Sequence, residues 1–313
     1  MSEFDLIRRF FTRATPGAVL GVGDDAALLQ VSPGNVLAVS TDMLVCGTHF
    51  FPDADPYLLG HKTLAVNLSD LAAMGAVPRW ATLAISIPNE EVAWLERFSA
   101  GFFALAQQYG VDLVGGDTTR GPLNLCVTIF GEVPAQQALR RDGAKAGDDI
   151  WVSGELGDAA LALAHLLGRI KLGEAEFAAC AARLHQPHPR VALGLALRGI
   201  ASGAIDVSDG LLADLGHILE RSNVGAEVEF DALPVSPSLR GRSQQKLALC
   251  GGDDYELCFT VPAERRAEVK RIAETLGLPL TRIGKIVAGR GCIVHDAHGH
   301  PIDIEVEGYD HFR

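Results

Sequence analysis

Hydrophobic positions recur along the first 133 residues with two different periods. A spacing of three to four residues predicts helices, and strict alternation predicts strands. On this basis we predict helices over residues 4–12, 57–74 and about 89–109, with Asn89 as an N-cap, and strands over residues 36–42, 82–87, 111–114 and 123–133. This mixture indicates an α+β arrangement.

The second half of the chain repeats the mixture with shorter strands. The predicted strands cover residues 150–153, 204–207, 226–230, 255–261, 280–287 and 291–295. The predicted helices cover residues 158–167, 174–184, 190–201, 263–276 and a segment that follows Gly210 and ends near Arg221. Together the two halves predict a protein of the α/β class, with mixed α+β character.

The length of 313 residues exceeds the size that one hydrophobic core usually supports, so two domains are expected. Between residues 134 and 149 the composition changes to Gln, Arg, Lys, Gly and Asp. We therefore predict an N-terminal domain at residues 1–140 and a C-terminal α/β domain at residues 141–313.

Short acidic turns recur where apolar segments end. The first is Gly21-Val22-Gly23-Asp24-Asp25, and the others are Ser40-Thr41-Asp42, Ser69-Asp70, Gly115-Gly116-Asp117-Thr118, Asp206-Val207-Ser208-Asp209-Gly210 and Gly251-Gly252-Asp253-Asp254. A single Asp in a Gly-rich turn is more often a turn former. If the fold gathers several of them, bound divalent cations are needed to offset the repulsion between like charges.

Two predicted elements would carry parts of such a site. The strand over residues 36–42 would place Asp42 at its carboxyl end. On the helix that follows, Thr63, Asn67 and Asp70 fall at i, i+4 and i+7 and share one face. This largely uncharged stripe is more typical of a site wall than of a solvated surface.

The oxygen-rich set of side chains favours magnesium, which often joins carboxylates to phosphate groups. No P-loop, EF-hand or HExxH motif occurs. Arg120, Arg140 and Arg141 are candidates for binding phosphate, with solvated surface charge as the alternative. His49 could contact a substrate and Tyr309 could stack on one, although a lone His or a terminal aromatic residue more often has a structural role.

The overall charge excludes some partners. With 27 basic and 39 acidic side chains the formal net charge is −12, which argues against nucleic acid and anionic membrane surfaces as partners. The six cysteines form no CxxC pair, so we expect reduced, mostly buried thiols. The N-terminus lacks a signal-peptide pattern and no apolar run could span a bilayer, so a cytoplasmic location is expected.

Seven segments together resemble the bacterial thiamine-monophosphate kinase family, and they cover nearly the whole chain. They are GVGDDAALL, STDMLVCGTHF, NLSDLAAMGAVP, VGGDTTRGPL, AIDVSDGLLADLGHI, GGDDYELCFTVP and the closing GYDHF. The wider superfamily includes aminoimidazole ribonucleotide synthetase and selenophosphate synthetase. The resemblance implies ATP-dependent phosphorylation of thiamine monophosphate to thiamine diphosphate with several Mg²⁺ ions. It also implies a homodimer that forms through the sheet of the N-terminal domain.

The resemblance also assigns roles to residues that match the family motifs. The implied metal ligands are Asp25, Ser40, Thr41, Asp42, Asp70, Asp117, Asp206 and Asp209, of which Asp42, Asp117 and Asp209 are the expected catalytic residues. ATP would contact Gly116, Asp117, Arg141 and Ser208, and the thiamine substrate would contact His49, Asp253 and Tyr309. One departure is visible, since Asp253 replaces the Glu that is usual in the family.

Three alternatives remain open from the residues. The first is another ATP-using enzyme of the same superfamily, and the second is a magnesium-dependent phosphatase. The third is a regulator that binds nucleotide or metal without turnover. ATP consumption that requires an acceptor argues for a kinase, phosphate release without ATP argues for the phosphatase, and a regulator would bind ATP without turnover.

Overall fold

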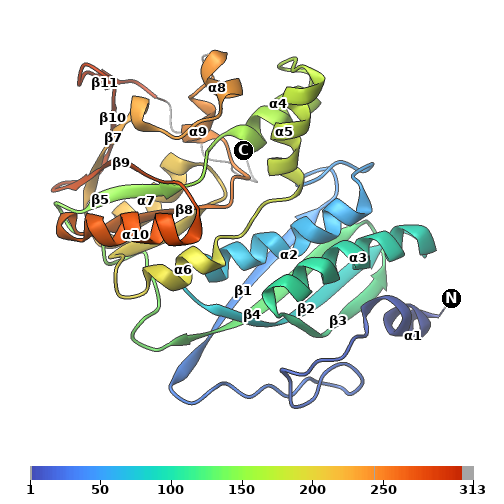
Figure 1. The fold of residues 1–313 in the computed structure, drawn as a ribbon. Helices are drawn as coiled ribbons and strands as arrows, with labels where there is room; N and C mark the ends of the chain where they lie inside the picture. The colour runs from blue at the N-terminus through green and yellow to red at the C-terminus, as the bar shows by residue number, and fades with distance from the viewer. Residues whose placement is uncertain (1, 243, 305–313) are drawn as a thin grey trace. The chain divides into compact units, whose positions relative to one another are not determined.

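The computed structural model describes residues 2–242 and 244–304. The chain divides into two compact units (Figure 1). Unit 1 comprises residues 1–71 and 76–136, and unit 2 comprises residues 72–75 and 137–313. The predicted domain boundary at residue 140 stays a prediction.

Unit 1 contains one sheet of four strands. In chain order its elements are α1 (Glu3–Leu6), the π-helical turn η1 (Ile7–Phe11), β1 (Asn35–Val45), α2 (Pro56–Ala73), β2 (Val77–Ile87), α3 (Val92–Tyr109), β3 (Asp112–Arg120) and β4 (Asn124–Pro134). The strand order is β1-β4-β2-β3, and only β2 and β3 run parallel. Helices α2 and α3 lie side by side next to this sheet (Figure 1).

The two faces of this sheet differ in burial. On one face, Leu125, Val127 and Ile129 of β4 are fully buried. On the other face, β1 exposes 55% of Val39 and 54% of Met43. Strands buried on one face alternate in this way, so the alternation of β1 assigns Ser40 and Asp42 to the buried face and Thr41 to the open face.

Unit 2 contains a sheet of seven strands in the order β11-β10-β7-β9-β5-β8-β6. Its strands are β5 (Asp149–Ser153), β6 (Gly203–Val207), β7 (Gly225–Glu229), β8 (Glu256–Val261), β9 (Leu280–Val287), β10 (Gly291–His295) and β11 (Pro301–Ile302). Its helices are α4 (Asp158–Leu166), α5 (Glu174–His185), α6 (Val191–Leu197), α7 (Leu211–Ser222), α8 (Pro237–Gly241), α9 (Leu247–Cys250) and α10 (Arg266–Leu276), with 3₁₀ turns η2 (Phe230–Ala232) and η3 (Ala263–Arg265). Among the described residues no helix has the length and apolarity needed to cross a membrane.

The core of unit 2 lies around β5, β6 and β8, in which every residue is buried. Helix α7 adds an apolar stripe that includes Leu215 and Ile218. The chain leaves β6 directly into the Ser208-Asp209-Gly210 turn and α7. This core therefore fixes the position of one of the acidic motifs.

The structure confirms most predicted elements but corrects several boundaries, among them the start of β2 at Val77 and the end of α6 at Leu197. Asp42 lies inside β1, which continues to Val45, because β1 pairs with β4 over its whole length. Strand β3 does not end before Gly115, because pairing with β2 extends it to Arg120. Helix α3 begins after Glu91 without a side-chain cap, so the prediction of Asn89 as the N-cap was wrong.

The cysteines also differ in part from expectation. Cys180 and Cys258 are buried, whereas the other four thiols are half-buried, and all six are free. Burial raises the pKa of Cys180 to about 12, with further repulsion from Asp158. The prediction of mostly buried thiols therefore holds for these two only.

Candidate active site

The acidic motifs of β1 and α2 meet on the buried face of the first sheet. The Ser40 hydroxyl donates a hydrogen bond to the Asp70 carboxylate. The Asp42 backbone N–H donates to Asn67 Oδ1 over 3.2 Å. The structure thus brings together Ser40, Asp42, Asn67 and Asp70, and Asn67 and Asp70 face β1 from the same side of α2.

Thr41 and Asp117 belong to the other face of the sheet. The Thr41 hydroxyl lies 2.9 Å from the Thr128 hydroxyl on β4. In the strand register Asp117 of β3 pairs with Ala84 of β2. Gly116 pairs with Leu83, which lies in the same row across the sheet as Asp42 of β1. Because successive rows face opposite sides of a sheet, unit 1 alone does not bring the carboxylates of Asp42 and Asp117 together.

Gly116 has a backbone role that no other residue could fill. Its φ is 148°, and a Cβ there would lie 1.9 Å from the Leu83 carbonyl oxygen. Only glycine adopts this conformation at such a close approach. Gly116, directly before Asp117, is therefore required for pairing between β2 and β3.

The segment that carries Asp25 is attached to the sheet at both ends. Near its start, the Gly17 N–H donates to Asp112 over 2.7 Å and Trp80 Nε1 donates to the Gly17 carbonyl over 2.9 Å. Near its end, the Ser32 N–H donates to buried Glu132 over 2.6 Å. Asp25 itself is exposed between these attachments.

His49, Arg141 and Tyr309 have different surroundings. His49 accepts the Val45 N–H at Nδ1 over 2.9 Å in the turn after β1. Arg141 is exposed, and its carbonyl accepts a hydrogen bond from the Ser222 hydroxyl over 2.8 Å. Tyr309 lies outside the described residues.

In unit 2 the Ser208-Asp209-Gly210 turn is held by one buried carboxylate, Asp214. Its Oδ2 accepts the N–H groups of Ser208, Asp209 and Gly210 over 3.0, 3.1 and 3.2 Å. Burial raises the pKa of Asp214 to about 7 against the effect of these donors, and the charge of Asp209 adds to the rise. Asp206 is buried within β6, the strand that leads into this turn.

The Gly251–Tyr255 turn lies directly against this loop. The Asp253 N–H donates to the Ser208 carbonyl and the Tyr255 N–H to the Val207 carbonyl, both over 2.8 Å. Asp253 and Tyr255 have φ values of 70° and 51°, in the left-handed region that non-glycine residues rarely occupy. Such conformations cluster at ligand sites and persist only where the surroundings enforce them.

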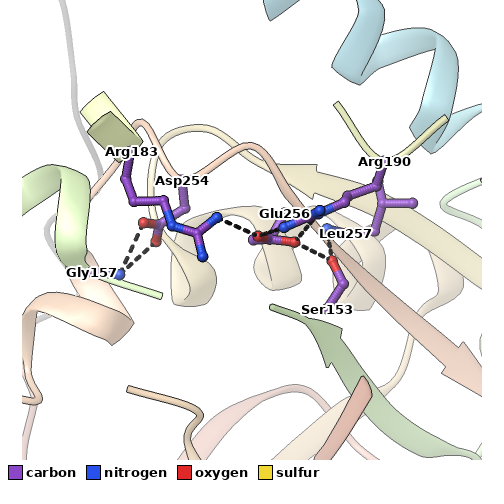
Figure 2. Close-up of polar contacts among 7 residues, drawn as sticks. All are labelled: Ser153, Gly157, Arg183, Arg190, Asp254, Glu256 and Leu257. Carbon is purple, nitrogen blue, oxygen red and sulfur yellow. Dashed lines mark hydrogen bonds and ion pairs between the residues drawn. The ribbon is translucent and has the colours of Figure 1, made fainter. Parts of the chain in front are cut away.

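Two further carboxylates, those of Asp254 and Glu256, lie at the end of this turn (Figure 2). Both Asp254 oxygens accept the Gly157 N–H at the start of α4 over 2.9 Å. Burial raises the pKa of Asp254 well above its ordinary range, and repulsion from Glu256 adds to the rise. The turn therefore rests on buried acidic groups, not only on backbone hydrogen bonds.

The arrangement within each unit limits how a metal could be held. No three His, Cys, Asp or Glu side chains come close enough to hold an ion within residues 2–242 and 244–304. On the buried face of the first sheet, Asp42 and Asp70 are accompanied by the hydroxyl oxygen of Ser40 and the amide oxygen of Asn67. Magnesium accepts such a set, because it commonly uses one or two carboxylates and takes its other ligands from water and substrate phosphates.

The sequence reasoning missed the residues that support the site. Asp214 carried a usable signal, since an acidic residue in the first helical turn after Ser-Asp-Gly is typical of a helix N-terminus. Glu256 and Arg190 carried none. Their partnership joins positions 66 residues apart in the chain.

Comparison with known proteins gives full-length matches. Residues 23–133 match the family described as AIR synthase related protein, N-terminal domain, and residues 145–297 match the corresponding C-terminal domain. The chain is 48% identical over 320 residues to thiamine-monophosphate kinase of Escherichia coli (strain K12), covering 99% of this chain and 98% of that protein.

Two solved structures are similar over nearly the whole chain. The crystal structure of thiamine-monophosphate kinase from Stenotrophomonas maltophilia K279a has a TM-score of 0.87 at 52% identity and covers 96% of this chain and 98% of its own. The structure of AaThiL complexed with AMPPCP and TMP has a TM-score of 0.80 at 32% identity, with coverage of 99% and 96%.

Proposed function

The chain belongs to the thiamine-monophosphate kinase family, and we propose that its acidic motifs serve the transfer of the γ-phosphoryl group of ATP to thiamine monophosphate. The protein is an ATP-dependent thiamine-phosphate kinase that forms thiamine diphosphate. The observation that carries this conclusion is 48% identity over nearly the full length of two named kinases. A phosphatase or another member of the superfamily is not favoured by these relatives.

The residues of unit 1 fit magnesium. Ser40, Asp42, Asn67 and Asp70 offer only oxygen donors, which are the ligands that Mg²⁺ prefers. We propose Asp25, Ser40, Asp42, Asp70 and Asp117 as magnesium ligands in this unit, with Asp117, on the opposite face, holding a different ion from Asp42. The Thr41 hydroxyl bonds Thr128 on the opposite face, so this set supports only a backbone contribution from Thr41.

The residues of unit 2 would serve the same reaction. Asp206 and Asp209 are the proposed metal ligands there, and Asp209 lies on the turn that Asp214 fixes. Ser208, Gly116 and Arg141 are the proposed contacts of ATP. His49, Asp253 and Tyr309 are the proposed contacts of the thiamine substrate.

The proposed mechanism is direct attack by a phosphate oxygen of thiamine monophosphate on the γ-phosphorus of ATP, with the bridging oxygen of ADP leaving in line. A phosphate monoester is largely ionised near neutral pH, so no strong general base is required. Catalysis then rests on positioning and on neutralisation of charge. Magnesium ions, when bound, would supply the neutralising charge, and Asp42, Asp117 and Asp209 are the residues proposed to hold them.

We further propose that unit 1 forms a homodimer with a second copy through the open face of its sheet. Val39 and Met43 expose about half of their apolar surface there, and Thr41 lies between them on the same face. Exposed apolar residues gathered on one face are typical of protein interfaces. A cytoplasmic location is consistent with the six free thiols.

The decisive experiment measures ADP formation from ATP and Mg²⁺ with thiamine monophosphate, with thiamine, or without an acceptor. We expect ADP and thiamine diphosphate only with thiamine monophosphate. ADP formation that does not depend on the acceptor, or phosphate release from thiamine monophosphate without ATP, would contradict the proposal.

A further inference from the structure

Glu256 and Arg190 form a buried ion pair that no role described so far uses. Glu256 is the first residue of β8 and directly follows the Asp253–Tyr255 turn. Its side chain is 2% exposed and that of Arg190 is 17% exposed. An ion pair withdrawn from water to this extent needs good geometry and further hydrogen bonds to be stable.

The geometry meets that requirement (Figure 2). Arg190 Nε donates to Glu256 Oε2 over 2.6 Å, and Arg190 Nη2 contacts Oε1 in a forked pair. The Ser153 hydroxyl donates to Oε2 over 2.5 Å and in turn accepts the Leu257 N–H over 2.9 Å. Arg183 Nη1 lies 3.9 Å from Oε1.

The backbone around Glu256 is shaped to admit its carboxylate. Gly154 follows β5 with a φ of 61°, and a Cβ on Gly154 would lie 2.2 Å from Glu256 Oε1. A side chain at position 154 would therefore displace the carboxylate. Gly154 and the two hydrogen-bonding partners, Arg190 and Ser153, together hold the carboxylate of Glu256 in a fixed position at the start of β8.

Glu256 directly follows a turn whose backbone conformation needs support from its surroundings. Asp253 and Tyr255 both have left-handed backbones, which are unfavourable for residues with a side chain. The turn is held on one side by the carbonyls of Val207 and Ser208. On the other side the chain passes from Tyr255 directly into Glu256.

We propose that Glu256, clamped by Arg190 and Ser153, is a positioning residue that keeps the Asp253–Tyr255 turn in the conformation that presents Asp253 to thiamine monophosphate. The proposal rests on the proposed function through the role given to Asp253. Glu256 acts through the backbone of the turn and does not itself touch the substrate.

The test compares Glu256→Gln and Glu256→Leu with Asp149→Asn. Asp149 is a matched control, since it is equally buried, lies on the adjacent strand β5 and is bonded by Arg266 and Arg282. We expect Glu256→Leu to raise the KM for thiamine monophosphate about tenfold or more, and the KM for ATP by less than about threefold. Glu256→Gln keeps an oxygen for Ser153 and Arg190 and should lie between wild type and Glu256→Leu.

Asp149→Asn should lower the melting temperature without changing either KM. If Glu256→Leu lowers the melting temperature to the same degree and also leaves both KM values unchanged, Glu256 is only structural and the proposal is overturned. Should Glu256→Leu fail to fold, Arg190→Lys keeps the charge but loses the fork. Arg266→Lys is then the control for Arg190→Lys. We expect Arg190→Lys to raise the KM for thiamine monophosphate more than the KM for ATP.

A second measurement does not depend on activity. Amide hydrogen exchange of the peptide that covers residues 251–257 should be faster in Glu256→Leu than in wild type and unchanged in Asp149→Asn. If wild type makes no thiamine diphosphate, the proposed function fails, whereas the exchange data still decide whether Glu256 holds the turn. Unchanged exchange in Glu256→Leu would overturn the positioning role.

Discussion

Asp42 shows how a single residue is placed by two neighbours in unit 1. Its backbone N–H is held by Asn67, and its strand neighbour Ser40 is held by Asp70. The backbone of Asp42 is thus held in place on β1, and neither of these two bonds involves its carboxylate. The substitution Asp42→Asn preserves both of these bonds.

We therefore expect Asp42→Asn and Asp117→Asn to lower kcat by about 10³-fold, because each removes a charge that would hold Mg²⁺ against the phosphates. Their melting temperatures in the absence of ligands should remain close to that of wild type. The measurements are steady-state ADP formation and differential scanning fluorimetry. Activity near the wild-type level in either variant would remove that residue from the catalytic set.

Asp149 illustrates the opposite case, in which a carboxylate serves stability. Burial alone would raise its pKa, but hydrogen bonds from Arg266 and Arg282 outweigh burial and hold the pKa below the ordinary value of 3.8. A carboxyl group whose pKa is lowered by folding stabilises the folded state above its unfolded pKa. That stabilisation is lost as the pH falls through the folded pKa.

Asp149→Asn should consequently lower the free energy of unfolding at pH 7 by about 2 kcal/mol, since it weakens charge-assisted hydrogen bonds of a buried group. The deficit should persist at pH 5 and shrink as the pH falls below about 4. Urea unfolding at several pH values measures it. A deficit that does not change with pH would show that packing, not charge, is responsible.

At the scale of elements, α2 and α3 cross at two glycines. A Cβ on Gly101 would lie 1.9 Å from the Tyr57 carbonyl, and a Cβ on Gly60 would lie 2.1 Å from the Phe98 carbonyl. The two helix backbones therefore approach each other more closely than any side chain would allow. This contact sets the position of α2, which carries Asn67 and Asp70.

Gly101→Ala should destabilise unit 1 by about 3 kcal/mol, because the added methyl group forces the helices apart. Gly216→Ala is the matched control, since no atom lies within 4 Å of a Cβ at that position of α7. The control should raise stability by about 0.5 kcal/mol through helix propensity. Equal effects of the two substitutions on thermal unfolding would refute the close crossing of α2 and α3.

At the scale of the whole molecule, the open face of the first sheet is the surface proposed for a second copy. Val39→Glu combined with Met43→Glu should convert the dimer to a monomer, because it places charges within the apolar contact. Ile293→Glu, at a site on β10 that is 50% exposed, is the control and should leave the mass unchanged. Light scattering coupled to size exclusion measures the mass, and a wild type that is monomeric would refute the proposal.

The sequence by itself determined the local features of this protein. Stop signals at Gly75 and Pro78 marked the end of α2. Apolar spacing located α7 and the buried strand β8, because burial of one face or of a whole strand leaves a pattern in the residues. The acidic turns were visible because Gly and Asp recur together. The face shared by Asn67 and Asp70 followed from helical spacing alone.

Only the tertiary structure decided which of these features meet. Pairing with β4 and β2 extended β1 and β3 through their acidic motifs, and the resulting register assigned Asp42 and Asp117 to opposite faces. The forked pair between Arg190 and Glu256 likewise depends on how the start of α6 lies against β8. Strand register and contacts across 66 residues are set by packing, and packing leaves no periodic signal in a single sequence.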